Sequence, residues 1–182
     1  MVLMFARKYP EAVAQLEHTS SMDRGFAIPY FMLHRIHLHS HQYDEAERAG
    51  RIWAELTGAV DPDDIVTLTR ALAGAVDRIA AILVLNDWEA RPTPRYMDIA
   101  AYYSLLNLTD EAIVALQEAV RRQHPMSTGI GLVPWFDNIR GDPRFQTLLR
   151  TMGLPDRSTP SMRFALTAGR GEFTDGRGPA PM

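Results

Sequence analysis

The stretch that decides the fold is residues 42–53, QYDEAERAGRIW, which has two counterparts at residues 8–19, KYPEAVAQLEHT, and 108–120, LTDEAIVALQEAV. Each places Glu-Ala just after a turn-forming residue and continues with apolar residues at helical spacing. The recurring alanines of the three stretches are Ala12, Ala46 and Ala112, and a fourth alanine, Ala80, lies between the last two. Their first two intervals are equal and the third is slightly shorter, so the chain repeats one helical unit with a period of about 34 residues.

A period of about 34 residues in an all-helical pattern is typical of the tetratricopeptide repeat, a helix pair that stacks into a solenoid. The chain resembles a tetratricopeptide-repeat protein over roughly residues 5–153. In the unit that contains Ala112, the characteristic large, small and aromatic positions are filled by Tyr96, Ile99, Ala100, Tyr103, Leu116 and Ala119. The first full unit is divergent, because His34 and Trp53 occupy small positions. The middle unit is weaker still, and its two helices either break at Gly74 or run together.

Cap residues place the ends of the helices. The pairs of an N-cap residue with proline at the first helical position are Asp61-Pro62, Thr93-Pro94 and Asp142-Pro143. No stretch shows the alternation of a strand with β-branched residues. We therefore expect an all-α chain, a tetratricopeptide-like α-α superhelix of antiparallel helix pairs, with helices near residues 10–19, 27–40, 43–57, 62–73, 75–88, 94–107, 109–123 and 143–152.

The C-terminal part of the array carries a more specific pattern. Residues 140–145, RGDPRF, resemble the motif that opens a short capping helix at the end of repeat arrays in many bacterial regulators. The resemblance implies that the chain is a sensory or scaffolding module of such a regulator. We expect Trp88, Trp135 and Phe136 to pack between the repeats and against the capping helix.

The composition of the chain changes at its C-terminal end. Residues 1–154 are expected to form one helical-repeat domain, and residues 155–182, rich in Gly and Pro, a disordered tail. The array begins with the second helix of a repeat, so the apolar residues 1–5, MVLMF, lack the cover that the end of a solenoid needs. Either the chain is a fragment of a longer regulator, or this helix docks on another chain or on a second copy.

The composition argues against several classes of function. With 19 Lys+Arg against 22 Asp+Glu the formal net charge is −3, which argues against a nucleic-acid partner. No cysteine is present, so thiolate metal sites and a cysteine nucleophile are excluded. No apolar run is long enough to span a membrane, and the start of the chain lacks the pattern of an export signal. The sequence therefore predicts a cytoplasmic protein with neither a membrane nor a nucleic acid as its partner.

In tetratricopeptide repeats one face of each first helix lines the concave groove where partners bind, and the resemblance carries this face onto the chain. The predicted groove residues are Ile28, Phe31, Arg35, Leu38, Ile65, Thr69, Leu72, Met97, Ala101 and Leu105. Only Arg35 among them is permanently charged, so the groove is expected to receive an apolar peptide or helix of another protein. The alternative is that a shifted register puts these residues into the core. The leading hypothesis is a non-enzymatic protein–protein interaction module.

The sequence contains little that supports a catalytic or metal-binding function. No nucleophile elbow, Walker loop or dinucleotide fingerprint occurs, so we predict no catalytic residue and no cofactor. His34, His37 and His41 are spaced by three and four residues on one predicted helical face, and such pairs can hold zinc or nickel. A metal-binding helical protein is thus an alternative function, although packed or solvated histidines are the ordinary explanation and we assign no metal site. A third hypothesis is a homo-oligomer closed through the uncapped N-terminal helix.

Overall fold

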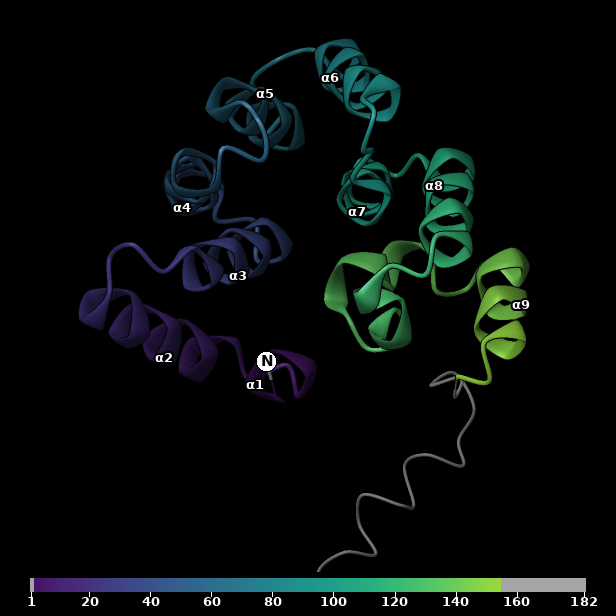
Figure 1. Cartoon of the computed structure of the whole chain (residues 1–182), viewed down its shortest axis with the longest axis horizontal. Coiled ribbons are helices and arrows are strands. Elements are labelled where there is room, and N and C mark those ends of the chain that lie inside the picture. The colour runs from purple at the N-terminus through teal and green to yellow at the C-terminus, as the bar shows by residue number, and fades with distance from the viewer. Residues whose placement is uncertain (1, 155–182) are drawn as a thin grey trace, which may run out of the picture.

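The structure is a computed structural model that describes residues 2–154 (Figure 1). These residues form helices and turns, with no strand among them. The α-helices are α1 (Val2–Phe5), α2 (Tyr9–Met22), α3 (Ala27–His39), α4 (Tyr43–Thr57), α5 (Pro62–Leu72), α6 (Arg78–Ala90), α7 (Tyr96–Leu105), α8 (Thr109–Arg121) and α9 (Pro143–Thr151), and two 3-10 helices, η1 (Pro125–Gly129) and η2 (Pro134–Ile139), lie between α8 and α9. The predicted all-α class is confirmed. The predicted tail, residues 155–182, lies outside the described residues.

Aspartate caps fix where α5 and α9 begin. Asp61 accepts a hydrogen bond from the backbone N–H of Asp63, and Asp142 accepts one from the backbone N–H of Arg144. In both helices the residue after the cap is proline, whose missing N–H would have had no partner in the first turn. These two predicted helix starts are confirmed.

The third predicted cap, Thr93-Pro94, is wrong. Helix α7 begins at Tyr96, and its N-cap residue Arg95 makes no capping hydrogen bond. The guanidinium Nε of Arg95 instead donates to Asp98 Oδ2 at 2.7 Å, inside the first turn of the helix. A bond between the side chains of the N-cap residue and the first turn thus accompanies the start of α7, which falls two residues later than predicted.

The helices pair in the order that the repeat predicts. Helix α3 packs on α4, α5 on α6, and α7 on α8, and α4 also packs on α5. The middle pair is broken at Gly74, whose φ of 74° is a conformation that glycine adopts without strain. Helix α6 starts at Arg78 rather than at residue 75, because Asp77 caps it by accepting from the N–H of Ile79. The arrangement is compatible with a helical repeat.

Three short helices, α1, η1 and η2, are absent from the sequence prediction. They have four, five and six residues, too few for a helical period to show in the sequence. Arg7, with a φ of 62°, separates α1 from α2. Pro125 and Pro134 are the first residues of η1 and η2. In a sequence these prolines suggest a loop, but in the structure each begins a short 3-10 helix.

The array curls until its two ends meet, as Figure 1 shows. Helices α2 to α6 form an arc, and α7 and α8 continue it, which brings η2 against both α7 and α3. At the same junction Arg7 NH2 donates to Asp137 Oδ1 at 2.8 Å, although the two residues are 130 positions apart. The concave side of the curl therefore faces other parts of the same chain. No described helix is both long enough and apolar enough to cross a membrane.

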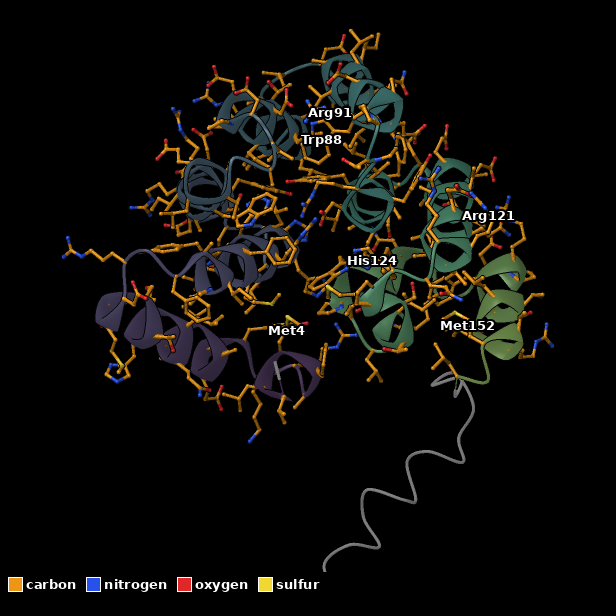
Figure 2. The ribbon with its side chains drawn as sticks, in the orientation of Figure 1. Met4, Trp88, Arg91, Arg121, His124 and Met152 are labelled. Carbon is orange, nitrogen blue, oxygen red and sulfur yellow. The ribbon has the colours of Figure 1, made fainter. Side chains whose placement is uncertain are left out.

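Aromatic side chains fill the core between the units. Trp88, Trp135 and Phe136 are all buried, and Figure 2 shows Trp88 on the inner side of the arc. Phe136 of η2 packs against Phe145 of α9, with ring centroids 6.3 Å apart. The prediction that these aromatic residues pack inside the array and against the C-terminal helix is confirmed.

Candidate functional site

The predicted groove residues lie mostly inside the protein. Six of the ten are buried, namely Arg35, Leu38, Ile65, Thr69, Met97 and Ala101. Three others are half-buried, namely Phe31, Leu72 and Leu105, and one, Ile28, is exposed. Because the curl brings α3 against η2 and next to α7, faces that would line an open groove in a wider superhelix here pack on one another. The six buried residues serve as core, which is the alternative that the sequence left open.

Arg35, the charged residue of the predicted groove, lies at the centre of the contact between α3 and α7. Its side chain is 2% exposed, and NH2 donates to Asp98 Oδ1 at 2.6 Å. The guanidinium carbon lies 4.8 Å from the ring centroid of Tyr102, 5.3 Å from that of Phe31 and 5.8 Å from that of Trp135. Aromatic faces attract a delocalised cation most strongly where water is excluded. The rings therefore stabilise a guanidinium whose Nε and NH1 have no hydrogen-bond partner among the described residues.

Asp98 binds two guanidiniums, one through each carboxylate oxygen. Oδ1 accepts from Arg35, and Oδ2 accepts from Arg95 Nε at 2.7 Å. Burial acts to raise the pKa of Asp98, but the charges and hydrogen bonds of Arg35 and Arg95 outweigh it and hold that pKa below its ordinary value. Asp98 is therefore ionised at neutral pH, and a charged triad joins the two helices.

His34 makes a second contact between the same helices. The ring is fully buried, with Nδ1 2.7 Å from the carbonyl oxygen of Ala46 and Nε2 2.7 Å from the hydroxyl of Tyr102. Because a carbonyl oxygen can only accept, Nδ1 carries the proton and Nε2 accepts from the Tyr102 hydroxyl. Burial, and then the positive charge of Arg35, lower the pKa of His34 to about 3. The histidine is therefore neutral and acts as a hydrogen-bonded core residue.

The three histidines of the metal hypothesis do not converge on one point. His37 Nδ1 is hydrogen-bonded to Gln42 Oε1 at 2.8 Å, and His41 Nδ1 to the Tyr43 hydroxyl at 2.9 Å, while both ring nitrogens of His34 are occupied. Helix α3 ends at residue 39, and His41 lies beyond it in a turn with a φ of 57°, so the predicted shared face does not exist. Among residues 2–154 no group of three or more His, Cys, Asp or Glu side chains is arranged to hold a metal ion.

Sequence reasoning missed the partners of Arg35. Helix α7 reads YMDIAAYYSL, and nearly all of it is buried, so Asp98 is a lone carboxylate in an apolar segment. A buried carboxylate needs a cation or several hydrogen-bond donors. That is the signal in the sequence for this cluster, and Arg35, the single charge in an apolar helix face, is its counterpart.

Apolar side chains stay exposed on the outer helices. On α6, Ile79 and Leu83 are 61% and 64% exposed, and on α4, Ile52 and Leu56 are 38% and 42% exposed. Each pair has a spacing of four residues, so its members share one helix face. Val114 on α8 is exposed as well. These residues offer a surface that a partner can cover.

Hollows also open between the outer helices. One of about 690 Å³ lies where α4 begins and α5 ends, and the Glu47–Arg70 ion pair, at 3.0 Å, forms part of its charged wall. Another of about 500 Å³ lies among α6, α7 and α8 and is lined by Glu89, Tyr96, Val114, Ala115, Gln117, Glu118 and Arg121. The second hollow touches α6 only at Glu89, near the C-terminal end of that helix, and is lined mainly by α8.

Comparisons of the chain with protein-family models, with curated proteins and with solved structures give no match in any of the three. The likeness to tetratricopeptide repeats therefore rests on the even spacing of the recurring Glu-Ala, on the helix pairs and on the C-terminal helix. The function has to be argued from the surfaces and contacts of this chain.

Proposed function

We propose that the chain is a non-enzymatic protein–protein interaction module of the tetratricopeptide type, the scaffold or sensory part of a bacterial regulator, which binds its partner on its outer helices. The observation that carries this proposal is the distribution of apolar side chains. The concave side is filled by core residues of α3, α7 and η2, whereas α4, α6 and α8 keep large apolar side chains exposed. On soluble proteins, exposed apolar patches mark sites where another molecule binds.

The closed curl supports such a role because it holds the outer helices in fixed positions. The Arg35–Asp98 ion pair joins residues 63 positions apart, and the Arg7–Asp137 ion pair joins residues 130 positions apart. A surface that is ordered before binding loses less conformational entropy when its partner arrives. These contacts between distant residues therefore act as a frame for the outer surface.

Photo-crosslinking in a lysate of the source organism tests this proposal. A photoreactive side chain is placed in the full chain at an exposed apolar position, Leu56, Leu83 or Val114, and in matched chains at the exposed polar positions Glu17 or Arg150. We expect a discrete crosslinked protein from at least one apolar position and none from the polar ones. Equal labelling at all positions, or none anywhere, would overturn the proposal.

A second candidate function, self-association, is favoured by exposed apolar side chains in the N-terminal part of the array. Val2, Met22, Phe26 and Ile28, on α1 and around the turn between α2 and α3, are exposed. Two copies that covered these side chains would remove them from water. Light scattering over a range of concentrations tests self-association. A mass above that of one chain, which falls in a Met22→Ser, Ile28→Ser variant, supports it. A mass of one chain at every concentration rules it out.

A further inference from the structure

A small apolar hollow lies between the first three helices. It has a volume of about 120 Å³ and is lined by Met4 of α1, by Met32 and Ile36 of α3, and by one face of α2. These three side chains are all buried, so the hollow reaches into the core of the array. Figure 2 shows Met4 on the side of α1 that faces α3. The described residues that line the hollow are all uncharged.

The face of α2 that lines the hollow carries two small side chains. Its residues, which recur at helical spacings of three and four, are Ala12, Gln15, Leu16 and Thr19. Alanine and threonine are too short to fill the space that a leucine at the same position would fill, and protein interiors are otherwise closely packed. The space therefore remains where Ala12 and Thr19 line it, between α2 and α3.

The short length of α1 leaves this space partly uncovered. Helices α4, α6 and α8 each pack on the helix that precedes them, and those helices, α3, α5 and α7, have 13, 11 and 10 residues. Helix α1, which precedes α2 and packs on it, has four residues. Four helical residues are about 6 Å long, so α1 covers about one turn of α2. One side chain of α1, Met4, reaches the hollow and forms part of its wall.

The polar groups at the hollow offer little to water or to an ion. The hydroxyl of Thr19 donates to the backbone carbonyl oxygen of Gln15 at 2.8 Å, within α2. The side chain of Gln15, at an exposed position, is the other polar side chain of the lining. A buried water needs about two to four polar partners, and a buried ion needs a counter-charge. The hollow therefore favours an uncharged apolar molecule.

We propose that this hollow, the α1–α3 pocket, binds a small uncharged apolar molecule of the size of one aromatic ring. The volume sets that size, because an apolar cavity of about 150 Å³ can bind benzene. A partner helix, about 10 Å across, is too wide to enter. Two flexible methionines, Met4 and Met32, line the pocket, and methionine sulfur makes favourable contacts with aromatic rings. The pocket is a site separate from the outer surface of the proposed function.

The test follows the methionine methyl groups by NMR in the full chain, labelled with methyl-enriched methionine. Toluene is the probe, and benzylammonium, which has a similar shape and a positive charge, is the control ligand. Met4→Leu and Met32→Leu variants assign the two pocket signals. The signal of Met97, which is buried on α7, is the internal reference.

Three variants of α2 show whether the response comes from the pocket. Ala12→Leu and Thr19→Leu each add a larger side chain to the lining. Ala14→Leu makes the same change as Ala12→Leu at an exposed position outside the lining. Circular dichroism establishes that each variant folds, and Thr19→Leu, at a half-buried position, supplies the test where Ala12→Leu does not fold.

We expect toluene to shift the Met4 and Met32 signals until they saturate, while the Met97 signal stays unchanged. Benzylammonium should shift none of the three. Each filling variant should weaken the binding of toluene by about tenfold or more, because the added side chain occupies the space of the ligand, and Ala14→Leu by about twofold or less.

Unchanged Met4 and Met32 signals overturn the proposal, and so does an equal response to toluene and benzylammonium. Equal weakening in the filling variants and in Ala14→Leu overturns it as well. So does a light-scattering mass above one chain that falls when toluene is added, because an apolar side chain of a second copy would then occupy the pocket. The crosslinking experiment on the outer helices does not depend on toluene, so the two proposals fail separately.

Discussion

Arg35 on α3 and Asp98 on α7 form a buried ion pair, with 2.6 Å between NH2 and Oδ1, although they are 63 residues apart in the sequence. Around it lie the ring of Tyr102, which also binds His34, and the guanidinium of Arg95. This cluster occupies the place where an open helical repeat would receive a ligand. The chain thus pairs the charges of Arg35, Asp98 and Arg95 with one another on its concave side, while Nε and NH1 of Arg35 have no hydrogen-bond partner among the described residues.

Removing one partner of this pair should be costly. In an Asp98→Asn variant the guanidinium of Arg35 stays buried without its counter-ion, and loss of one partner of a buried pair typically costs about 3–5 kcal/mol. The free energy of unfolding, measured by urea denaturation, should fall by about that amount. A double variant, Arg35→Met with Asp98→Leu, should recover part of the loss because no unpaired charge remains. A double variant less stable than both single ones would contradict this account.

The stability of the protein should fall as the pH drops below the ordinary pKa of histidine. His34 has its pKa lowered from 6.5 to about 3 by burial, so the unfolded chain takes up a proton at a higher pH than the folded one does. This contribution is fully present above pH 6.5 and is lost progressively between 6.5 and about 3. Between neutral pH and pH 5 the loss attributable to His34 should be about 2 kcal/mol.

A comparison of two histidine variants isolates that contribution. His34→Leu should be less stable at pH 7, because it leaves the Tyr102 hydroxyl without its acceptor and removes the side-chain hydrogen bond to the Ala46 carbonyl, yet its stability should change less between pH 7 and pH 5. His18→Gln, at an exposed position on α2, is the matched control for the loss of a histidine. Parallel pH profiles for His34→Leu and the unaltered chain would show that this histidine does not titrate as described.

Gly50 should not tolerate a methyl group. It lies inside α4, where alanine would ordinarily favour the helix by about 1 kcal/mol. A Cβ atom at this position would lie 2.6 Å from His34 Nδ1 and 2.6 Å from Ile65 Cγ2. The ring is held by two hydrogen bonds and the isoleucine is buried, so neither side chain can yield readily.

We therefore expect Gly50→Ala to lower the free energy of unfolding by about 1–3 kcal/mol, as overpacked cores do. The matched control is Gly141→Ala, where a Cβ atom would meet nothing within 4 Å. That change should stay within about 0.5 kcal/mol of the unaltered chain. A stabilising Gly50→Ala would mean that α3, α4 and α5 are packed less closely than described here.

The positions of the helices could be predicted from the sequence because their signals are local. The recurring Glu-Ala, the aspartate caps at Asp61 and Asp142 and the turn at Gly74 each act within a few residues. The start of α7 could not be predicted, because Arg95 binds Asp98 instead of leaving the cap to Thr93.

The burial of the predicted groove could not be predicted from the repeat pattern. It depends on how strongly the array curls, and the curl is fixed by contacts between distant residues such as Arg35 with Asp98 and His34 with Tyr102. The period of the repeat fixes the helix pairs but not the angle between successive pairs. The exposure of Ile79 and Leu83 on α6 could not be predicted either, because both look like core residues in the apolar sequence of this helix.

The second ion pair that closes the curl should behave differently from the first. Arg7 and Asp137 are 2.8 Å apart, but their side chains are 35% and 34% exposed, and Asp137 also binds Arg140 at 2.8 Å. Exposed pairs of this kind contribute about 0–1 kcal/mol and are weakened by salt.

An Arg7→Gln variant should therefore lose less than about 1 kcal/mol of stability, and its difference from the unaltered chain should shrink at high salt. Hydrogen exchange should quicken in α1 and at the start of α2 and leave α3 and α7 unchanged, because Arg7 binds Tyr9 of α2 and Asp137 of η2 and makes no hydrogen bond to α3 or α7. A loss as large as that of Asp98→Asn would instead show that both ends of the curl open together.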